Sequence, residues 1–254
     1  MAETNLTSGR LLILSSRKRP SGTAVLYLYG SLFVDPPKKE DFQLAAKLID
    51  KTGCDVCFLL HPLFPDYTLH DMVQCTREAI RFITSRYQLE RTAVLAFSTG
   101  CTLCLGALCG ENEEPLRKPA HLILNSPILR IPANDALMKQ MQVLDHYDCV
   151  LPAEYFRKDG ICGALIDAEP EESRQLRDPL FGSLNGLAAT DVYFGTYENA
   201  FVYLPEMIEK YRRAGIPLKV HEGEGMMHCW AVRSGGEEAN STMKEYVQLI
   251  RGLK

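Results

Sequence analysis

The sequence of 254 residues has no strong excess of charge of either sign, because 28 lysines and arginines stand against 32 aspartates and glutamates and the formal net charge is −4. A nucleic-acid-binding surface needs clustered cations. The one short basic run, Arg17-Lys18-Arg19, stands beside Pro20, a pattern that predicts a solvated turn. We therefore do not expect nucleic acid as a partner.

Long apolar runs are also lacking, since none approaches the roughly 18 residues of a membrane-spanning helix. Residues 1–5 lack the basic start and apolar core of a secretion signal. We expect no membrane insertion and a cytoplasmic location, in which the nine cysteines are reduced thiols. With 46% hydrophobic and 24% charged residues, the composition is that of a globular chain and predicts one domain over residues 1–254.

A four-ligand zinc pattern is missing as well, although two Cys-x-x-Cys pairs occur. Cys54 and Cys57 belong to a strand-like run, in which residues three apart point to opposite faces. Cys101 and Cys104 lie at the start of a predicted helix, where core packing is again the simplest role. We expect no metal site.

What the sequence does contain is a series of short apolar runs rich in β-branched and aromatic residues. They predict strands at Leu11–Leu14, Ala24–Tyr29, Val56–Leu60, Thr92–Phe97, Leu122–Leu124, Val192–Phe194 and Leu218–Val220. Amphipathic helical patterns separate several of these runs. The alternation predicts the α/β class, with a mostly parallel central sheet and helices on both faces.

The predicted helices have recognisable ends. Gly53, Gly110 and Gly215 each follow a helical pattern, at the position where a left-handed cap residue is expected. The last helix is predicted over Ser241–Leu253.

Residues from about 130 to 185 break the alternation, because prolines and glycines interrupt their helical and polar segments. The stretch lies between two predicted core strands and is interpreted as an insertion. It is long enough to cover a site as a lid, and an ordinary surface excursion is the alternative.

Ser98 follows directly on the predicted strand Thr92–Phe97, and a predicted helix follows it at once. Such a nucleophile elbow requires small neighbours, which Ala96 and Gly100 provide, and it presents the serine hydroxyl near a helix N-terminus, where negative charge is favoured. The alternative is a serine that only caps the helix.

A small-residue turn ends the predicted strand Ala24–Tyr29. The backbone N–H groups of Gly30 and Ser31, together with that of Thr99, are candidates for an oxyanion hole that stabilises the charge developed in acyl transfer. The alternative is an ordinary turn at the end of a strand.

His228 is the candidate base, in a glycine-containing loop after the predicted strand Leu218–Val220. Glu198, just after Val192–Phe194, is the candidate acid that orients it. Asp178 is a competing carboxylate, whereas Asp191 begins the strand and is expected to point away at its other end.

The chain order serine, acid, histidine is that of α/β-hydrolase triads. At these segments the chain resembles the hormone-sensitive-lipase-like α/β-hydrolases of the bacterial carboxylesterase type, over roughly residues 24–230. The resemblance rests on Tyr29-Gly30-Ser31 at the family's His-Gly-Gly-Gly turn, Ala96-Phe97-Ser98-Thr99-Gly100 at Gly-Asp-Ser-Ala-Gly, Asp178-Pro179-Leu180, Gly195-Thr196-Tyr197-Glu198 and Gly225-Met226-Met227-His228.

The resemblance implies an α/β-hydrolase fold and a serine hydrolase that cleaves small carboxylic esters through an acyl-enzyme, without metal or organic cofactor. Ser31 and Leu32 depart from it by replacing glycines of the oxyanion turn, and Phe97 replaces an acidic residue. Two alternatives stay open: a non-catalytic binding protein of this fold, and another serine acyl-transfer enzyme such as an amidase, peptidase or acyltransferase. The sequence favours no particular oligomeric state.

Overall fold

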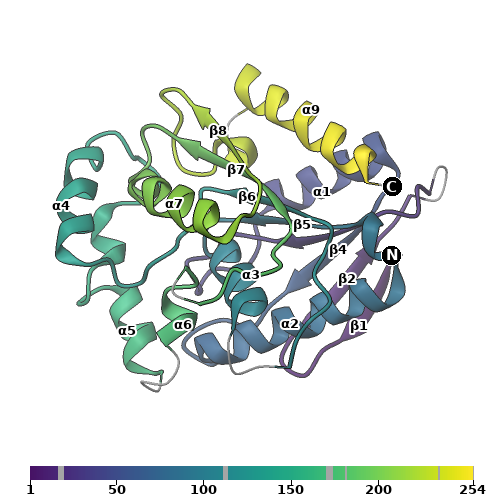
Figure 1. Cartoon of the computed structure of the whole chain (residues 1–254), viewed down its shortest axis with the longest axis horizontal. Helices are drawn as coiled ribbons and strands as arrows, with labels where there is room; N and C mark the ends of the chain where they lie inside the picture. The colour runs from purple at the N-terminus through teal and green to yellow at the C-terminus, as the bar shows by residue number, and fades with distance from the viewer. Residues whose placement is uncertain (17–19, 111–113, 170–173, 181, 234, 254) are drawn as a thin grey trace.

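The structure is a computed structural model that describes residues 1–16, 20–110, 114–169, 174–180, 182–233 and 235–253. The Arg17-Lys18-Arg19 run lies outside these residues. The centre of the fold is one eight-stranded sheet with the order β1-β2-β4-β3-β5-β6-β7-β8 (Figure 1).

The strands from β4 to β8 in this order are parallel, and β1 and β2 add two antiparallel strands at one edge. Their bounds are β1 Ala2–Asn5, β2 Arg10–Leu14, β3 Ala24–Leu28, β4 Asp55–Leu60, β5 Thr92–Phe97, β6 His121–Asn125, β7 Ala189–Gly195 and β8 Leu218–Gly223. The predicted α/β class with a mostly parallel sheet is confirmed. Strand β1 was not predicted, because its sequence is polar and it joins the sheet through backbone pairing at an exposed edge.

Helices cover both faces of the sheet, as predicted (Figure 1). One face carries α1 Lys39–Thr52, α8 Trp230–Arg233 and α9 Glu237–Gly252, and the other carries α2 Leu69–Arg86, α3 Thr99–Cys109 and α7 Leu204–Ala214. Two short 3-10 turns, η1 Leu89–Arg91 and η4 Asn199–Tyr203, precede β5 and α7. Each face has its own apolar core cluster, which accounts for strands that are buried on both sides.

The helix ends agree with the predictions in part. Gly53 and Gly215 adopt the left-handed conformation, with φ of 72° and 67°. The prediction for Gly110 is wrong, since its φ is −61°; the Arg77 guanidinium donates to the Ala107 carbonyl at 2.7 Å and satisfies this helix end instead. Helix α9 begins at Glu237, four residues before the predicted start, and so places two glutamates in its first turn, where the helix dipole favours them.

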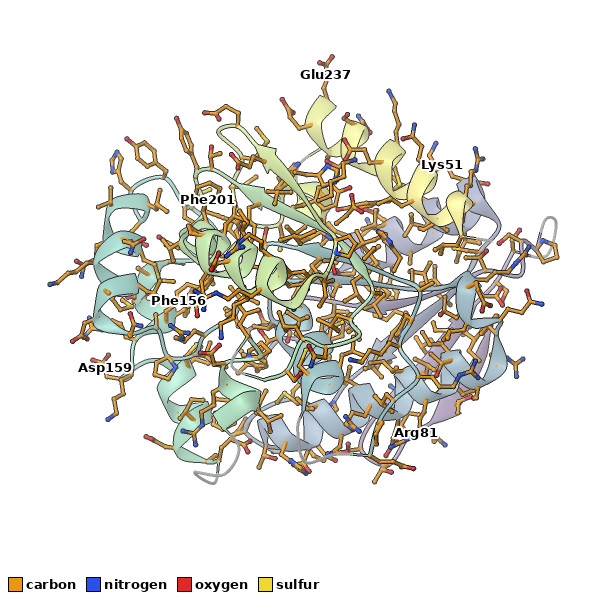
Figure 2. The ribbon with its side chains drawn as sticks, in the orientation of Figure 1. Lys51, Arg81, Phe156, Asp159, Phe201 and Glu237 are labelled. Atoms are coloured by element: carbon orange, nitrogen blue, oxygen red, sulfur yellow. The ribbon has the colours of Figure 1, made fainter. Side chains whose placement is uncertain are left out.

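The stretch between β6 and β7 contains α4 Asp135–Leu144, η2 Ala153–Phe156, α5 Ile161–Asp167 and α6 Arg174–Arg177. Phe156 is buried and packs edge to face with Tyr203, at 6.3 Å between ring centroids. Asp159 lies at the outer edge of the same stretch (Figure 2). This part of the chain is therefore folded onto the body of the molecule.

The cysteines follow the same division into two core clusters. Cys54 packs in the cluster beside α1 and α9, and Cys57 packs in the cluster on the opposite face. Burial raises the pKa of the Cys54 thiol to about 11 and that of Cys57 to about 12. Of the nine thiols, only Cys149 is exposed. In the part of the chain that the structure describes, no helix is both long and apolar enough to span a membrane.

Candidate active site

Ser98 occupies a sharp turn between β5 and α3. Its φ of 53° and ψ of −123° are strained for a residue with a Cβ, and they are the conformation of a nucleophile elbow. The turn brings α3 against β3 so closely that a Cβ on Gly100 would lie 2.5 Å from the Leu28 carbonyl oxygen. Glycine is therefore needed at position 100 for packing.

The structure brings Ser98, His228 and Glu198 together in one hydrogen-bonded chain. His228 Nε2 lies 2.9 Å from Ser98 Oγ, and His228 Nδ1 lies 2.6 Å from Glu198 Oε2. The three residues are 5%, 2% and 0% exposed, respectively. With the proton on Nδ1 donated to the carboxylate, Nε2 is free to accept the serine hydroxyl proton.

The electrostatics of the buried pair favour a charged imidazole. Burial lowers the pKa of His228, but Cys229 and the Glu198 carboxylate raise it more, and the net pKa lies above the ordinary value of 6.5. Burial raises the pKa of Glu198. Hydrogen bonds oppose this increase, and they come from His228, Ser126 and the Gly195 N–H. The acid is thus surrounded by donors that stabilise its ionised form.

The two other carboxylates considered from the sequence lie elsewhere. Asp178 accepts a hydrogen bond from Arg130 Nε at 2.7 Å. Asp191 lies between His121 and His221, at 2.8 and 2.5 Å. Burial raises the pKa of Asp191, yet these two imidazoles hold it well below its usual range. Neither carboxylate contacts His228.

Ser126 supports both the acid and the histidine loop, a role that was not predicted from the sequence. Ser126, just after β6, has a φ of 48°, and its hydroxyl both hydrogen-bonds Glu198 and accepts the Cys229 N–H at 2.9 Å. Its neighbour Asn125 accepts from the Tyr246 hydroxyl and donates to the Ala96 carbonyl at 3.2 Å. Polar residues at the end of the buried strand β6 and directly after it were the signal that could have found this pair.

The predicted oxyanion turn follows β3 and lies against the elbow. Gly30 needs its lack of a side chain, because a Cβ there would lie 2.7 Å from Ser98 Cβ. The left-handed residues are Leu32 and Phe33, with φ of 49° and 67°. The Ser31 N–H is directed at Thr99 Oγ1, at 3.1 Å. Of the three predicted amides, that of Ser31 therefore already has an acceptor.

A small cavity of about 160 Å³ opens at the serine. Ser98, His228 and the oxyanion turn form one side of it, and the stretch between β6 and β7 contributes Val150, Leu151 and Tyr155. Asp35 and Lys38 complete its lining.

The cavity wall formed by the β6–β7 stretch is fastened to the turn that carries Glu198. The Asn199 side-chain amide donates to Asp145 Oδ1 and to the Leu151 carbonyl, both at 2.9 Å, and its backbone N–H donates to Asp148 Oδ2 at 2.8 Å. Asp148 also accepts the Leu151 N–H at 3.0 Å. The residue after the candidate acid thus holds the cavity wall.

The histidine loop touches the same stretch at its surface. Cys149 Sγ lies 3.8 Å from Met227 Sδ, and Met227 immediately precedes His228. Tyr147 stacks on Tyr197, with 4.7 Å between ring centroids. The stretch therefore packs over both loops that carry the acid and the histidine.

Comparisons with known proteins agree with this architecture. A family model described as alpha/beta hydrolase fold matches residues 25–232, and the chain belongs to that family. No curated protein matches the chain.

Many solved structures share the fold. An esterase from the bacterial hormone-sensitive lipase family is 20% identical with a TM-score of 0.83, over 99% of this chain and 84% of that one. A hormone-sensitive lipase from a metagenome library is 16% identical with a TM-score of 0.83, over 99% and 85%. EstE5, soaked with p-nitrophenyl butyrate, is 17% identical with a TM-score of 0.84, over 98% and 83%. At these identities the likeness establishes the fold.

Proposed function

We propose that the protein is a carboxylesterase that cleaves small carboxylic esters with Ser98 as nucleophile, His228 as base and Glu198 as orienting acid. The observation that carries the proposal is the continuous hydrogen-bonded chain from Ser98 through His228 to Glu198 at the wall of a cavity. Esterase structures of the same fold support it.

In the proposed reaction, His228 Nε2 takes the Ser98 proton while Oγ attacks the ester carbonyl carbon, and the carbonyl π pair moves onto oxygen. Collapse of this intermediate expels the alcohol, which receives the proton from His228. A water molecule then adds to the acyl-enzyme while His228 takes its proton, and the bond from Ser98 Oγ to the acyl carbon breaks. The carboxylic acid leaves as His228 returns the proton to Ser98 Oγ. The Thr99 and Gly30 amides are the backbone donors proposed for the oxyanion.

The size of the cavity supports short acyl groups. A volume of about 160 Å³ is close to that of a cavity of about 150 Å³ that binds one benzene molecule. A single domain with residues 130–185 as a lid-like insertion is part of the proposal. Val150, Leu151 and Tyr155 of this insertion lie opposite the serine and would enclose the acyl group.

One observation favours a non-catalytic binding protein as the second candidate. The Ser31 N–H is bonded to Thr99 Oγ1, so it does not point freely into the cavity. A binding protein needs no oxyanion hole and would keep the cavity while lacking turnover.

Hydrolysis of p-nitrophenyl acetate and butyrate tests the proposal. An esterase is expected to release a burst of about one p-nitrophenol per protein, followed by steady turnover, because p-nitrophenolate leaves readily and deacylation is then the slower step. The p-nitroanilide of butyric acid is the matched amide, and preferential cleavage of it would indicate an amidase. Binding of the esters without release of p-nitrophenol would support the second candidate.

The lid part of the proposal predicts that Asn199→Ala weakens both the fold and substrate binding. It removes donors to Asp145 and to the Leu151 carbonyl, so we expect a loss of about 1–3 kcal/mol of unfolding free energy and a higher KM for p-nitrophenyl butyrate. Urea unfolding and steady-state kinetics measure the two effects.

Asn240→Ala is the matched control, because Asn240 is exposed on α9. It should leave the unfolding free energy and KM unchanged. A normal KM in a measurably destabilised Asn199→Ala variant would mean that the anchored segment does not shape the substrate site.

A further inference from the structure

Thr99 places a side-chain hydroxyl beside the predicted oxyanion hole. It is the first residue of α3, directly after Ser98, and its side chain is 1% exposed. Its Oγ1 accepts the N–H of Ser31, which lines the cavity together with Ser98. The hydroxyl therefore contacts the oxyanion turn from the residue that follows the nucleophile.

The hydroxyl proton has no acceptor among the hydrogen bonds of the described residues. A threonine hydroxyl offers one donor and two lone pairs, and here the Ser31 N–H uses one lone pair. A buried donor without an acceptor is costly, and an oxygen that enters beside Ser31 with the substrate would supply an acceptor. An oxygen that gains negative charge during the reaction is an acceptor of this kind.

We propose that Thr99 is a catalytic residue whose hydroxyl donates a hydrogen bond to the oxyanion, in addition to its backbone N–H. This inference rests on the proposed esterase function. The Ser31 N–H then acts indirectly, because it fixes the rotamer of Thr99 and polarises the hydroxyl that it donates to. As Oγ of Ser98 bonds to the carbonyl carbon and its proton moves to His228, the charged oxygen is held by Thr99, whose own proton stays on its oxygen.

The arrangement accounts for the departure of the turn from a glycine-rich pattern. With the left-handed conformation at Leu32 and Phe33, the Ser31 amide faces Thr99 rather than the open cavity. A side chain without a hydroxyl at position 99 would leave this buried N–H without its acceptor. The Thr99 hydroxyl accepts the Ser31 N–H and, in the proposal, takes its place as a donor to the oxyanion.

Thr99→Val and Thr99→Ser test the proposal, because valine keeps the shape without the hydroxyl and serine keeps the hydroxyl. We expect Thr99→Val to lower kcat for p-nitrophenyl butyrate by about 100-fold with KM within about threefold of wild type, since the bond forms only in the transition state. Thr99→Ser should retain most of the activity. The pH profile of Thr99→Val should match that of wild type, because His228 keeps its contacts.

Thr102→Val is the matched control, a buried threonine of the same helix whose hydroxyl donates to the Ile128 carbonyl. This variant should have a lower free energy of unfolding than wild type but nearly the same kcat. Unchanged turnover by Thr99→Val would overturn the proposal. Faster turnover would also overturn it and would show that the hydroxyl blocks the Ser31 amide. If the valine variant does not fold, Thr99→Ala replaces it in the same kinetic measurement, because alanine also lacks the hydroxyl.

Phosphonylation by a fluorophosphonate separates this inference from the function on which it rests. The reagent places a P=O oxygen in the oxyanion hole and needs no deacylation. Labelling of wild type at Ser98 with a rate that Thr99→Val reduces supports both statements, and equal rates in the two proteins overturn the Thr99 role alone. Absence of both labelling and turnover in wild type overturns both.

Discussion

Ser98→Ala is expected to lower kcat for p-nitrophenyl butyrate by about 10⁴-fold or more. Ser98 Oγ lies 2.9 Å from His228 Nε2, and alanine removes this oxygen. Serine and alanine both carry a Cβ, so the strained φ of 53° at position 98 destabilises the variant no more than the wild type. Steady-state rates and the thermal midpoint measure activity and folding separately.

Ser85→Ala is the matched control, because Ser85 is an exposed serine of α2. It should retain wild-type rates. Release of p-nitrophenol by Ser98→Ala at a rate near that of wild type would show that the hydrolysis occurs at another group, and the assignment of the nucleophile would be withdrawn.

Glu198→Gln is expected to lower kcat by about 10³- to 10⁴-fold. The carboxylate accepts the Nδ1 proton at 2.6 Å, and so leaves Nε2 unprotonated toward the serine. A glutamine amide can instead donate to Nδ1, which favours the tautomer with its proton on Nε2. That tautomer cannot accept the Ser98 proton.

The same substitution has an effect on pH dependence whose sign follows from the charges. His228 must be neutral to act as base, so kcat/KM rises with pH through its pKa in the free enzyme. In wild type this rise should be centred above 6.5, because Cys229 and Glu198 outweigh the effect of burial. In Glu198→Gln the carboxylate no longer raises the pKa of His228, whereas burial still lowers it. The rise of kcat/KM should therefore move to lower pH.

The residual activity of Glu198→Gln between pH 5 and 9 measures this shift. Glu245→Gln is the control, since Glu245 contacts His221 at 3.0 Å and has no contact with His228. If kcat/KM rises over the same pH range in wild type and in Glu198→Gln, another group sets the charge of His228.

The sequence predicts those parts of the fold that depend on local patterns. The strands β3, β4 and β5 are continuous apolar runs, and Gly53 and Gly215 end helices with a φ that glycine adopts readily. The segments of Ser98, Glu198 and His228 each follow a strand, and parallel strands bring such segments to one edge of the sheet.

Features that depend on contacts distant in sequence were not predictable. Strand β1 has a polar sequence and forms because β2 offers it an edge. Gly110 is not left-handed because Arg77, from another helix, satisfies the end of α3. The direction of the Ser31 amide toward Thr99 likewise depends on a contact between a loop and the start of α3, which are 68 residues apart.

The distribution of thiols makes the protein suitable for observing movement near the serine. Burial suppresses the reactivity of a thiol, and eight of the nine cysteines are buried, whereas Cys149 is exposed. A maleimide dye would therefore attach at one position, beside Met227 in the loop of His228. Fluorescence from that dye would report, without any mutation, whether the insertion moves relative to the histidine loop when an ester enters the cavity.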